Sequence, residues 1–563
     1  MSMRLFPAQP MTPYAWRDAA EVFLVDLTIP GGEMIGGALA GPGARMDGAH
    51  MGGAHFGDII TLGDVVIPTE RRRWATSDYA MPIDDATPRQ YDGRVSDPGS
   101  FERSIALSPI DSPEIKTNGG TVTLVNTDGR LDDLFDELEV RGCPVEIRLG
   151  RAGALRASFD FLAKLYVTGW DISLADATLT LGDVTPAFDQ NIAFTTYPGT
   201  GGLNGSADLE GQMRPLVFGQ VYNMAPILID PVRQIYQCHD GFVQSIDAVR
   251  DGGMPLDLDG NVGTYALLES RSVPPGQYAT CRAVSCFKLG SIPTFRVTAD
   301  VIGRAGSGGS IGAIDMAKVL ANEVETITGA GAGVVPVDVD NAAFTALAAT
   351  DRNDVIGWVV SEPTTYRTLM NILLGPAVCF WGASRTGRIT VRAFEPPDPG
   401  GAVVANYDAN DVLDVDRITM PQGYETGHRS RTVNYARNWS PMDGSEVAAA
   451  APMKWGLRRE WASYTAPATV PMRAAITPDP SDSALRTAGA ATRSANRMQA
   501  LHGQPRRMYL MTSRLTAGEV IPDLGDQVRV TYDRLSLDGG RVLRVVGVQE
   551  EYAEGTVALT LWG

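Results

Sequence analysis

The sequence GGSIG at 308–312 has the G-x-S-x-G spacing of a hydrolase nucleophile elbow. In such an elbow, a serine on a sharp turn between a strand and a helix attacks an acyl carbon while a histidine removes its proton. Only His428 and His502 follow Ser310 in the sequence, and the flanking pattern lacks the parallel β/α sheet that supports an elbow. We interpret the motif as a Gly/Ser linker that introduces a helix, with a Ser310-based hydrolase as an alternative.

Two glycine-rich runs, 303–312 and 329–333, have the composition of a phosphate-binding loop. Neither ends in the Lys-Ser/Thr pair of a P-loop, and the second follows a helical pattern where a dinucleotide fingerprint requires a strand. We interpret both runs as ordinary loops.

The cysteines are few and odd in number: Cys143, Cys238, Cys281, Cys286 and Cys379. This usage fits reduced thiols better than a disulfide framework. Cys238, Cys281 and Cys286 could bind an iron–sulfur cluster if another cysteine supplied a fourth thiolate, but their spacing lacks a C-x-x-C signature. We expect buried, inert cysteines and no cofactor, with the cluster as the alternative.

Three other groups of side chains could bind a metal or act as acids. His50 and His55, beside Met46 and Met51, could bind a soft metal, but a Gly-rich loop is a poor preorganised site, so we expect a contact loop. Asp257, Asp259 and Asn261 resemble part of a calcium loop, but Leu268 stands where the bidentate Glu belongs, so we expect a hairpin turn. The acidic run at 128–137 is typical of a solvated turn.

The composition indicates a soluble, β-rich protein of several domains, because 563 residues exceed what one hydrophobic core supports. The net charge of −18 argues against nucleic-acid binding, which requires a cationic face. No run approaches a membrane span and the start lacks a signal-peptide pattern, so we expect synthesis in the cytosol.

Periodicity predicts a mainly β fold with one α+β insertion. Apolar residues at helical spacing predict helices over 317–327, from about 363 to 375, and over 482–502. Alternating runs predict a strand at 21–29 and a β-meander at the C-terminus. We expect an N-terminal strand and Gly/Met-rich loop (1–90), a β-domain (91–196), a β-rich domain (197–303), an α+β domain (304–400) and a C-terminal domain with one helix (401–563).

Several phrases resemble tail proteins of siphophages, prophages and gene-transfer-agent-like particles. They are GRVSDPGSFERS (93–104), TVTLVNTDGRLDD (121–133), YPGTGGLNGSADLEGQMRPLVFG (197–219), HDGFVQSIDAVRDGG (239–253), GQYATCRAVSCFKLGSIPTFRVTADV (276–301) and VALTLWG (557–563). The resemblance implies a baseplate hub with β-barrel or sandwich-like domains, similar to the central hub of phage tails. It implies a homotrimer in the virion tail tip, assembled in the host cytoplasm and not an enzyme. Its expected partners are the distal tail ring, the central fibre or tip protein and the tape-measure protein, with DNA only in passage through the lumen.

A receptor- or carbohydrate-binding tip protein is the second hypothesis. This hypothesis places three aromatic side chains on loops, where they could stack against sugars: Trp74, Tyr79 and Trp439. Such aromatic side chains are more often part of a core or an interface.

Overall fold

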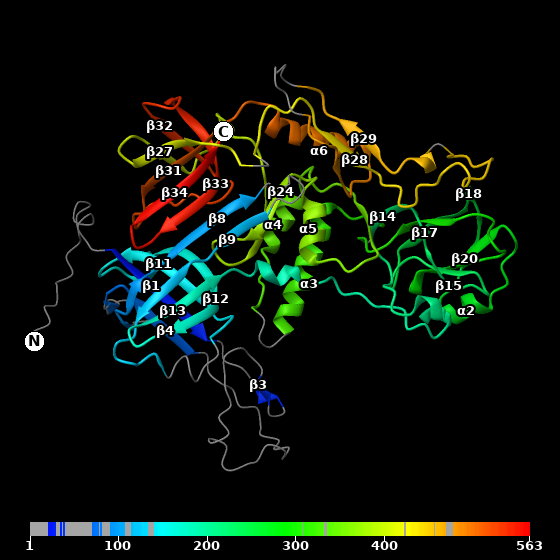
Figure 1. The fold of residues 1–563 in the computed structure, drawn as a ribbon, viewed down its shortest axis with the longest axis horizontal. Helices are drawn as coiled ribbons and strands as arrows, with labels where there is room; N and C mark the ends of the chain where they lie inside the picture. Colours follow the sequence, from blue (N-terminus) through cyan, green and yellow to red (C-terminus); the bar gives the residue numbers. More distant parts are fainter. Residues whose placement is uncertain are drawn as a thin grey trace, which may run out of the picture.

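The computed structural model describes residues 21–29, 34–35, 38–39, 70–77, 79–80, 90–106, 114–132, 140–306, 308–330, 335–421, 424–454, 456–468 and 477–563. The fold is mainly β with α+β insertions, as the sequence predicts. Figure 1 shows two groups of strands side by side, one from each end of the chain, with helices at the centre and a separate lobe on the other side. No described helix combines the length and apolar character that a membrane crossing requires.

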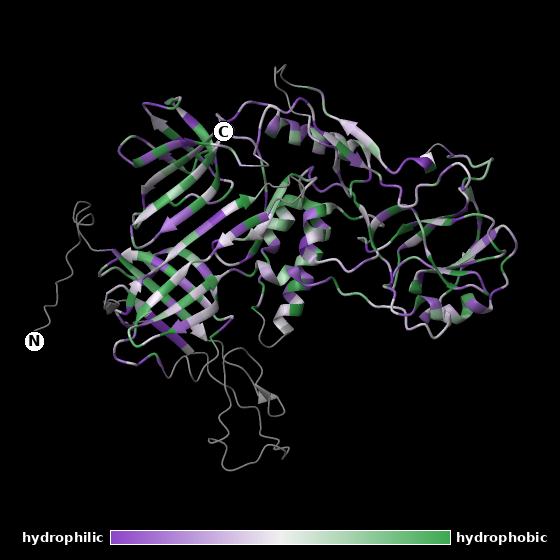
Figure 2. Cartoon of the chain, in the orientation of Figure 1, coloured by the Kyte–Doolittle hydropathy of each residue, from purple (hydrophilic) through white to green (hydrophobic). Residues whose placement is uncertain are grey.

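The first group of strands forms a seven-stranded sheet, here called the N-terminal sheet. Its order is β4 (Glu70–Ala75), β1 (Glu21–Ile29), β11 (Pro144–Arg151), β12 (Asp160–Ile172), β13 (Asp176–Gly182), β10 (Thr121–Val125) and β7 (Val95–Asp97). Side chains alternate in burial along β10, β11 and β13, and Val145, Ile147 and Leu149 of β11 enter the core. The alternation of hydropathy along the strands is visible in Figure 2, so one face of each of these three strands supplies the core.

A ten-stranded sheet, here called the large sheet, curls into an open half-barrel (Figure 1). Its path is β25 (Ile389–Ala393), β24 (Cys379–Ala383), β9 (Glu114–Asn118), β8 (Ser100–Ala106), β33 (Leu537–Glu551), β34 (Thr556–Trp562), β31 (Met508–Arg514) and β27 (Val412–Ile418), while β32 (Gln527–Tyr532) joins β33, and β26 (Ala405–Tyr407) joins β32. The predicted C-terminal meander is confirmed. Strand pairing nevertheless crosses the expected domain ranges, because β8 comes from the 91–196 range and pairs with β33.

The central helices are α3 (Ala313–Ala330), α4 (Asn341–Ala348) and α5 (Tyr366–Leu374). In α5 the expected apolar face is buried, and Thr365 caps the N-terminus by accepting a hydrogen bond from the Thr368 backbone. In α3 the expected face is buried except for Ile327, which is 43% exposed. The helical pattern therefore predicted both helices, and α4 was missed.

The helix α6 is shorter than the predicted 482–502 and spans Ala488–His502. Thr487 caps it by accepting a hydrogen bond from the Ala490 backbone. Before this cap the backbone binds other segments, because the Ala484 carbonyl accepts from Gly357. Tertiary hydrogen bonds therefore replace the first helical turns that the sequence pattern predicts.

The lobe contains two five-stranded sheets and α2 (Tyr265–Ser270). The first runs β18 (Met254–Pro255), β17 (Ser245–Asp251), β22 (Val297–Ile302), β14 (Leu216–Met224) and β23 (Gly357–Val360), and the second runs β15 (Ile227–Asp230), β16 (Ile235–Gln237), β21 (Cys286–Leu289), β20 (Gln277–Cys281) and β19 (Asp257–Asn261). The prediction of a hairpin turn at 257–261 is wrong, since these residues form β19, which pairs in parallel with β20. Asp259 accepts a hydrogen bond from Arg271 at 2.6 Å.

Shorter elements complete the described fold. The strands are β2 (Met34–Ile35), β3 (Ala38–Leu39), β5 (Tyr79–Ala80), β6 (Gln90–Tyr91), β28 (Thr432–Tyr435), β29 (Ala462–Thr465) and β30 (Ser481–Asp482), and the 3₁₀ turns are η3 (Arg156–Ser158), η4 (Thr185–Asp189), η5 (Gly202–Asn204), η6 (Ala207–Leu209), η7 (Arg282–Val284) and η8 (Gly456–Arg458). Met442, Val447 and Leu457 pack together beside Met254 of the lobe, so a late part of the chain covers an earlier one.

Candidate functional site: the junction of the two β-sheets

Ser310 lies in an exposed turn that leads into α3, and its surroundings differ from those of a nucleophile elbow. Its backbone carbonyl accepts a hydrogen bond from Gly306, and Gly309 has a φ of 74°. The preceding strand β22 belongs to an antiparallel sheet. Within the described residues the Ser310 hydroxyl has no hydrogen-bonded base.

The two candidate bases lie together in another part of the fold. The rings of His428 and His502 stack with centroids 5.0 Å apart. Burial, together with the nearby Arg431 guanidinium, lowers the pKa of His428 to about 4 and that of His502 to about 3. Both imidazoles are therefore neutral at neutral pH, and they pack with each other at the end of α6.

Of the three candidate cluster cysteines, two lie on adjacent strands and Cys238 follows the end of β16. Cys281 and Cys286 are directly opposite each other on β20 and β21 and enter one hydrophobic core, whereas Cys238 enters another. Cys143 and Cys379 are buried in two further cores. Burial raises the pKa of Cys238 and Cys286 well above the ordinary thiol value. In the described parts of the chain, no three His, Cys, Asp or Glu side chains are grouped to hold a metal ion.

The remaining sequence candidates are partly outside the described residues. His50, His55, Met46, Met51, residues 331–333 and the Tyr79 side chain lie there. The expectation that Trp74 lies on a loop and stacks against sugars is wrong, because Trp74 lies on β4 and is 3% exposed. Trp439 is half-buried and packs edge-on against Trp358 with Arg437 over its ring. In the acidic run, Asp128 pairs with Arg94 at 2.6 Å.

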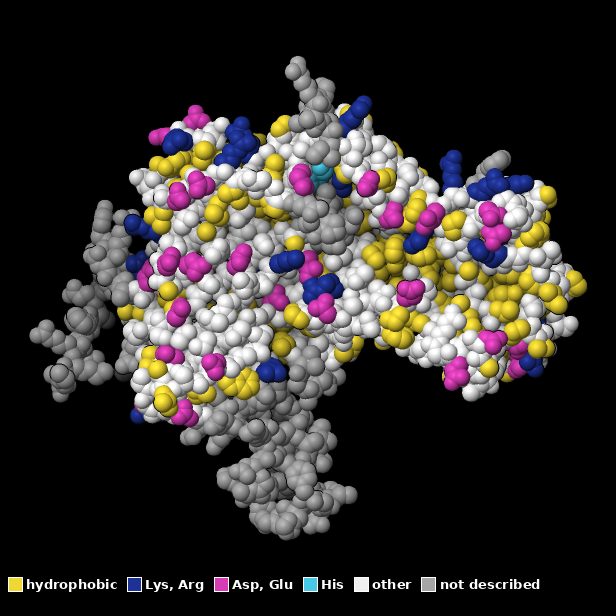
Figure 3. Space-filling view, viewed as in Figure 1, with side chains coloured by type: hydrophobic (Ala, Val, Ile, Leu, Met, Phe, Trp, Pro, Cys, Tyr) yellow, Lys and Arg dark blue, Asp and Glu magenta, His cyan; other side chains and the backbone are white. Residues whose placement is uncertain are grey.

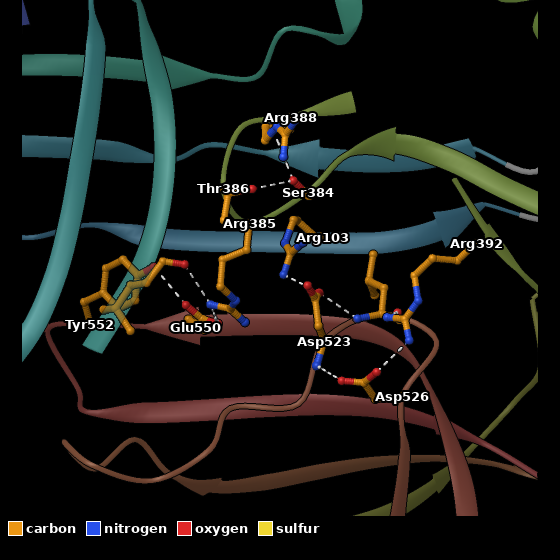
Figure 4. Close-up of polar contacts among 12 residues, drawn as sticks. Arg103, Ser384, Arg385, Thr386, Arg388, Arg392, Asp523, Asp526, Glu550 and Tyr552 are labelled. Atoms are coloured by element: carbon orange, nitrogen blue, oxygen red, sulfur yellow. Dashed lines mark hydrogen bonds and ion pairs between the residues drawn. The ribbon is translucent and has the colours of Figure 1, made fainter. Parts of the chain in front are cut away.

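The junction between the two sheets holds a network of buried charges, shown in Figure 4. Arg103 of β8 donates from Nη2 to Asp523 Oδ1 at 2.6 Å. Arg385 Nη1 lies 2.5 Å from Glu550 Oε1 on β33, and the Tyr552 hydroxyl donates to Glu550 Oε2 at 2.8 Å. We call Arg103, Arg385, Asp523, Glu550 and Tyr552 the junction network. Each buried charge in it faces an opposite charge, which offsets the loss of hydration.

The turn between β24 and β25 brings Arg385 against β12 of the N-terminal sheet and β33 of the large sheet. The Arg385 carbonyl accepts a hydrogen bond from the Lys164 backbone of β12 at 2.9 Å, and Arg385 Nη1 donates to the Leu162 carbonyl at 2.9 Å. The Ser384 and Thr386 hydroxyls lie 3.0 Å apart within the turn. Through Arg385, the β24–β25 edge of the large sheet contacts both β12 of the N-terminal sheet and β33 of its own sheet.

Electrostatics in the junction network favour the charged form of Asp523. Burial raises the pKa of Asp523, but the Arg103 and Arg385 guanidiniums outweigh this effect and hold its pKa below the usual range. Burial lowers the pKa of Arg103, and Asp523 opposes that change. With every charge paired, the junction network can fix the relative orientation of the sheets.

The sequence carried a signal for the junction network that the periodicity analysis missed. Phe101, Arg103 and Ile105 alternate along β8, and all three are buried. A charged residue at an inward position of an amphipathic strand indicates a buried ion pair. Its partner could not be named, because Asp523 lies far along the chain.

The segments that resemble tail proteins lie in three places. Those at 93–104 and 557–563 supply β8 and β34, which flank β33 in the large sheet, and that at 121–133 supplies β10 of the N-terminal sheet. Those at 197–219, 239–253 and 276–301 supply strands β14, β17, β20, β21 and β22, half of the lobe's strands.

Comparisons with known proteins found likeness only among solved structures, since neither a protein-family model nor a curated protein matches. The tail protein from Neisseria meningitidis MC58 is similar at 9% identity and a TM-score of 0.35, over 86% of this chain and 97% of that one. A chain of the native gene transfer agent virion is similar at 13% identity and a TM-score of 0.39, over 63% and 84%. The 43 kDa tail protein of prophage MuSo2 from Shewanella oneidensis gives 11% identity and a TM-score of 0.36, over 84% and 95%. The solved structures to which the chain is similar are thus phage-type tail and virion proteins.

Proposed function

We propose that the chain is a structural, non-enzymatic component of a phage-type tail tip. It would act as a hub that closes or extends the tail tube and connects the distal tail ring to the central fibre or tip protein. The placement of the tail-like phrases carries this proposal. They supply strands on both sides of β33 and half of the lobe's strands, so the resemblance concerns the scaffold of the fold.

The junction network supports a scaffold role. Arg385 links the β24–β25 edge of the large sheet to β12 and to β33, and Arg103 links β8 to Asp523. Breaking such buried pairs is costly, so they hold the units in one relative orientation. A tube-closing component needs that rigidity, because each of its surfaces must meet a neighbouring ring in a fixed register.

Surface properties are also compatible with this role. The net charge of −18 suits a conduit through which DNA passes without binding. Figure 3 shows hydrophobic side chains gathered on the lobe. Val232 is 90% exposed, Ile292 80% and Phe242 60%, and exposed apolar surface of this kind suits contact with other subunits, including further copies in a homotrimer.

A genetic test separates the hub from the hydrolase alternative. Deleting the gene from a particle-producing strain should leave particles without a finished tail tip in electron micrographs, and the wild-type gene should restore it. Ser310→Ala should restore it equally, because Ser310 lies in a turn without a base. Normal particles from the deletion strain would overturn the hub, and failure of Ser310→Ala alone would favour the hydrolase.

A cryo-EM map of the isolated tail tip tests the oligomer and its neighbours. We expect a ring of three copies with the lobe against an adjacent tail protein. A monomer within the particle, or the absence of the chain from it, would contradict the proposal.

A further inference from the structure

A cleft lies between the N-terminal sheet and the edge of the large sheet. Its volume is about 800 Å³, within the range of about 300–1,000 Å³ that is common for binding clefts. One wall holds Glu21 and Arg151, which are register partners on β1 and β11. Residues 404–407 and 513–516 also line it, so the cleft is lined by residues of both sheets.

The wall at 404–407 includes an edge strand. Among the described strands, β26 pairs only with β32, so its second edge has no partner there. Exposed strand edges favour pairing with another extended segment, and proteins commonly cover them. The cleft therefore offers backbone groups to an extended peptide.

Side chains in the cleft are suited to a segment that is apolar and weakly cationic. Val404 is 44% exposed and Val520 69% exposed, and both line the cleft. Burial raises the pKa of Tyr407 to about 12, and the nearby carboxylates of Glu519 and Asp411 add to this rise. Among the charged side chains that line the cleft, Glu21, Asp411 and Glu519 outnumber Arg151 and Arg514, so the cleft carries a small net negative charge.

The chain itself has a segment of matching chemistry that begins at the cleft. Residues 1–20, MSMRLFPAQPMTPYAWRDAA, lie outside the described residues and join the structure at Glu21, which lines the cleft. Their large apolar side chains are Met1, Met3, Leu5, Phe6, Met11, Tyr14 and Trp16. Arg4 and Arg17 outnumber the single acidic residue Asp18.

Tethering favours this segment over any free peptide. Twenty extended residues span about 66 Å, so the segment can reach every part of the cleft. A tether of this length gives an effective concentration on the order of millimolar, which makes even weak contacts sufficient.

We propose that residues 1–16 of this chain dock in the cleft, with their backbone along the free edge of β26 and their apolar side chains on Val404 and Val520. The segment would cover an edge strand that could otherwise pair with another molecule. The proposal does not depend on the tail function, because it concerns the isolated chain alone.

Photo-cross-linking of the full-length chain tests the docking. A photoreactive phenylalanine analogue at Phe6 should form intramolecular cross-links to peptides containing residues 404–407 or 513–521, identified by mass spectrometry. The double variant Val404→Lys with Val520→Lys should lower that yield by roughly tenfold, since it replaces apolar contact surface with charges that repel Arg4 and Arg17.

The lobe provides a matched control, because Val232→Lys with Ile292→Lys changes two exposed apolar side chains outside the cleft. This variant should leave the yield unchanged, and circular dichroism should show both variants folded. Equal yields from both double variants, or cross-links to other segments, would overturn the proposal. Cross-linked dimers would overturn it in favour of docking between two copies.

Discussion

The Arg385 guanidinium lies 2.5 Å from the Glu550 carboxylate, measured from Nη1 to Oε1, where the Glu550 side chain has no exposed surface. Arg385 sits on the turn between β24 and β25, and Glu550 lies on β33. Because Arg385 also donates to the Leu162 carbonyl of β12, this pair connects two distant strands of the large sheet to the N-terminal sheet. Its loss should weaken the whole junction.

Arg385→Ala should lower the free energy of unfolding by about 3–5 kcal/mol, because it leaves Glu550 buried without its charge partner. Chemical denaturation measures this. Arg388→Ala is the matched control, since Arg388 pairs with Asp338 at 3.2 Å where both side chains are about half exposed, and such pairs contribute roughly 0–1 kcal/mol. Similar losses in the two variants would contradict the importance of the buried pair.

Stability should fall as the pH drops from 6.5 toward 4, because His428 and His502 are held neutral by burial. Their folded pKa values of about 4 and about 3 lie below the ordinary 6.5, so the unfolded chain takes up protons first. The contribution of the two neutral imidazoles to the free energy of unfolding is fully present above pH 6.5. It is lost progressively as the pH falls below 6.5 toward their folded pKa values. Each histidine contributes up to about 1.4 kcal/mol per pH unit.

Denaturation of the double variant His428→Gln with His502→Gln at several pH values isolates this effect. The slope of stability against pH between 6.5 and 4 should be shallower than in the wild type. A smaller slope should persist, because burial also lowers the pKa of His239 to about 4. An unchanged slope would show that the stacked pair does not carry the pH dependence.

Gly290→Ala should destabilise the lobe by about 1–3 kcal/mol, because the added methyl group would overpack a closed site. Its Cβ would lie 1.8 Å from the Pro274 carbonyl oxygen, which is backbone and cannot rotate away. Gly263→Ala, where a Cβ meets open space, should change stability by less than about 1 kcal/mol. Thermal unfolding and limited proteolysis of the lobe compare the two variants, and equal behaviour would refute the close approach.

All five cysteines should react slowly with iodoacetamide in the folded chain and quickly after unfolding. Each is buried, and burial raises the pKa of Cys379 to about 12, which leaves little thiolate at pH 8. Mass spectrometry after timed alkylation measures the rates. Native labelling of Cys281 or Cys286 at the unfolded rate would contradict their burial, and iron analysis of the same sample tests the expectation of no cluster.

The sequence predicted those elements whose signal is local. Helix α5 was predicted from Tyr366, Leu369, Met370, Leu373 and Leu374, all of which are buried, because one apolar face at helical spacing is sufficient evidence. The start of α6 was misplaced, since Ala484 fits the helical spacing but its carbonyl binds Gly357. Likewise, Asp259 was expected in a turn, but parallel pairing with β20 places it in a strand.

The sequence by itself determined the fold class, the helices α3 and α5, the C-terminal meander and the weakness of the Ser310 motif. These follow from residue spacing within one segment and from the supply of histidines after Ser310. Only the tertiary structure decided that β8 pairs with β33, that Arg385 meets Glu550 and that a cleft opens beside β26. Hydrogen bonds and ion pairs between segments far apart in the chain leave no periodic pattern in either segment, so packing alone selects the partners.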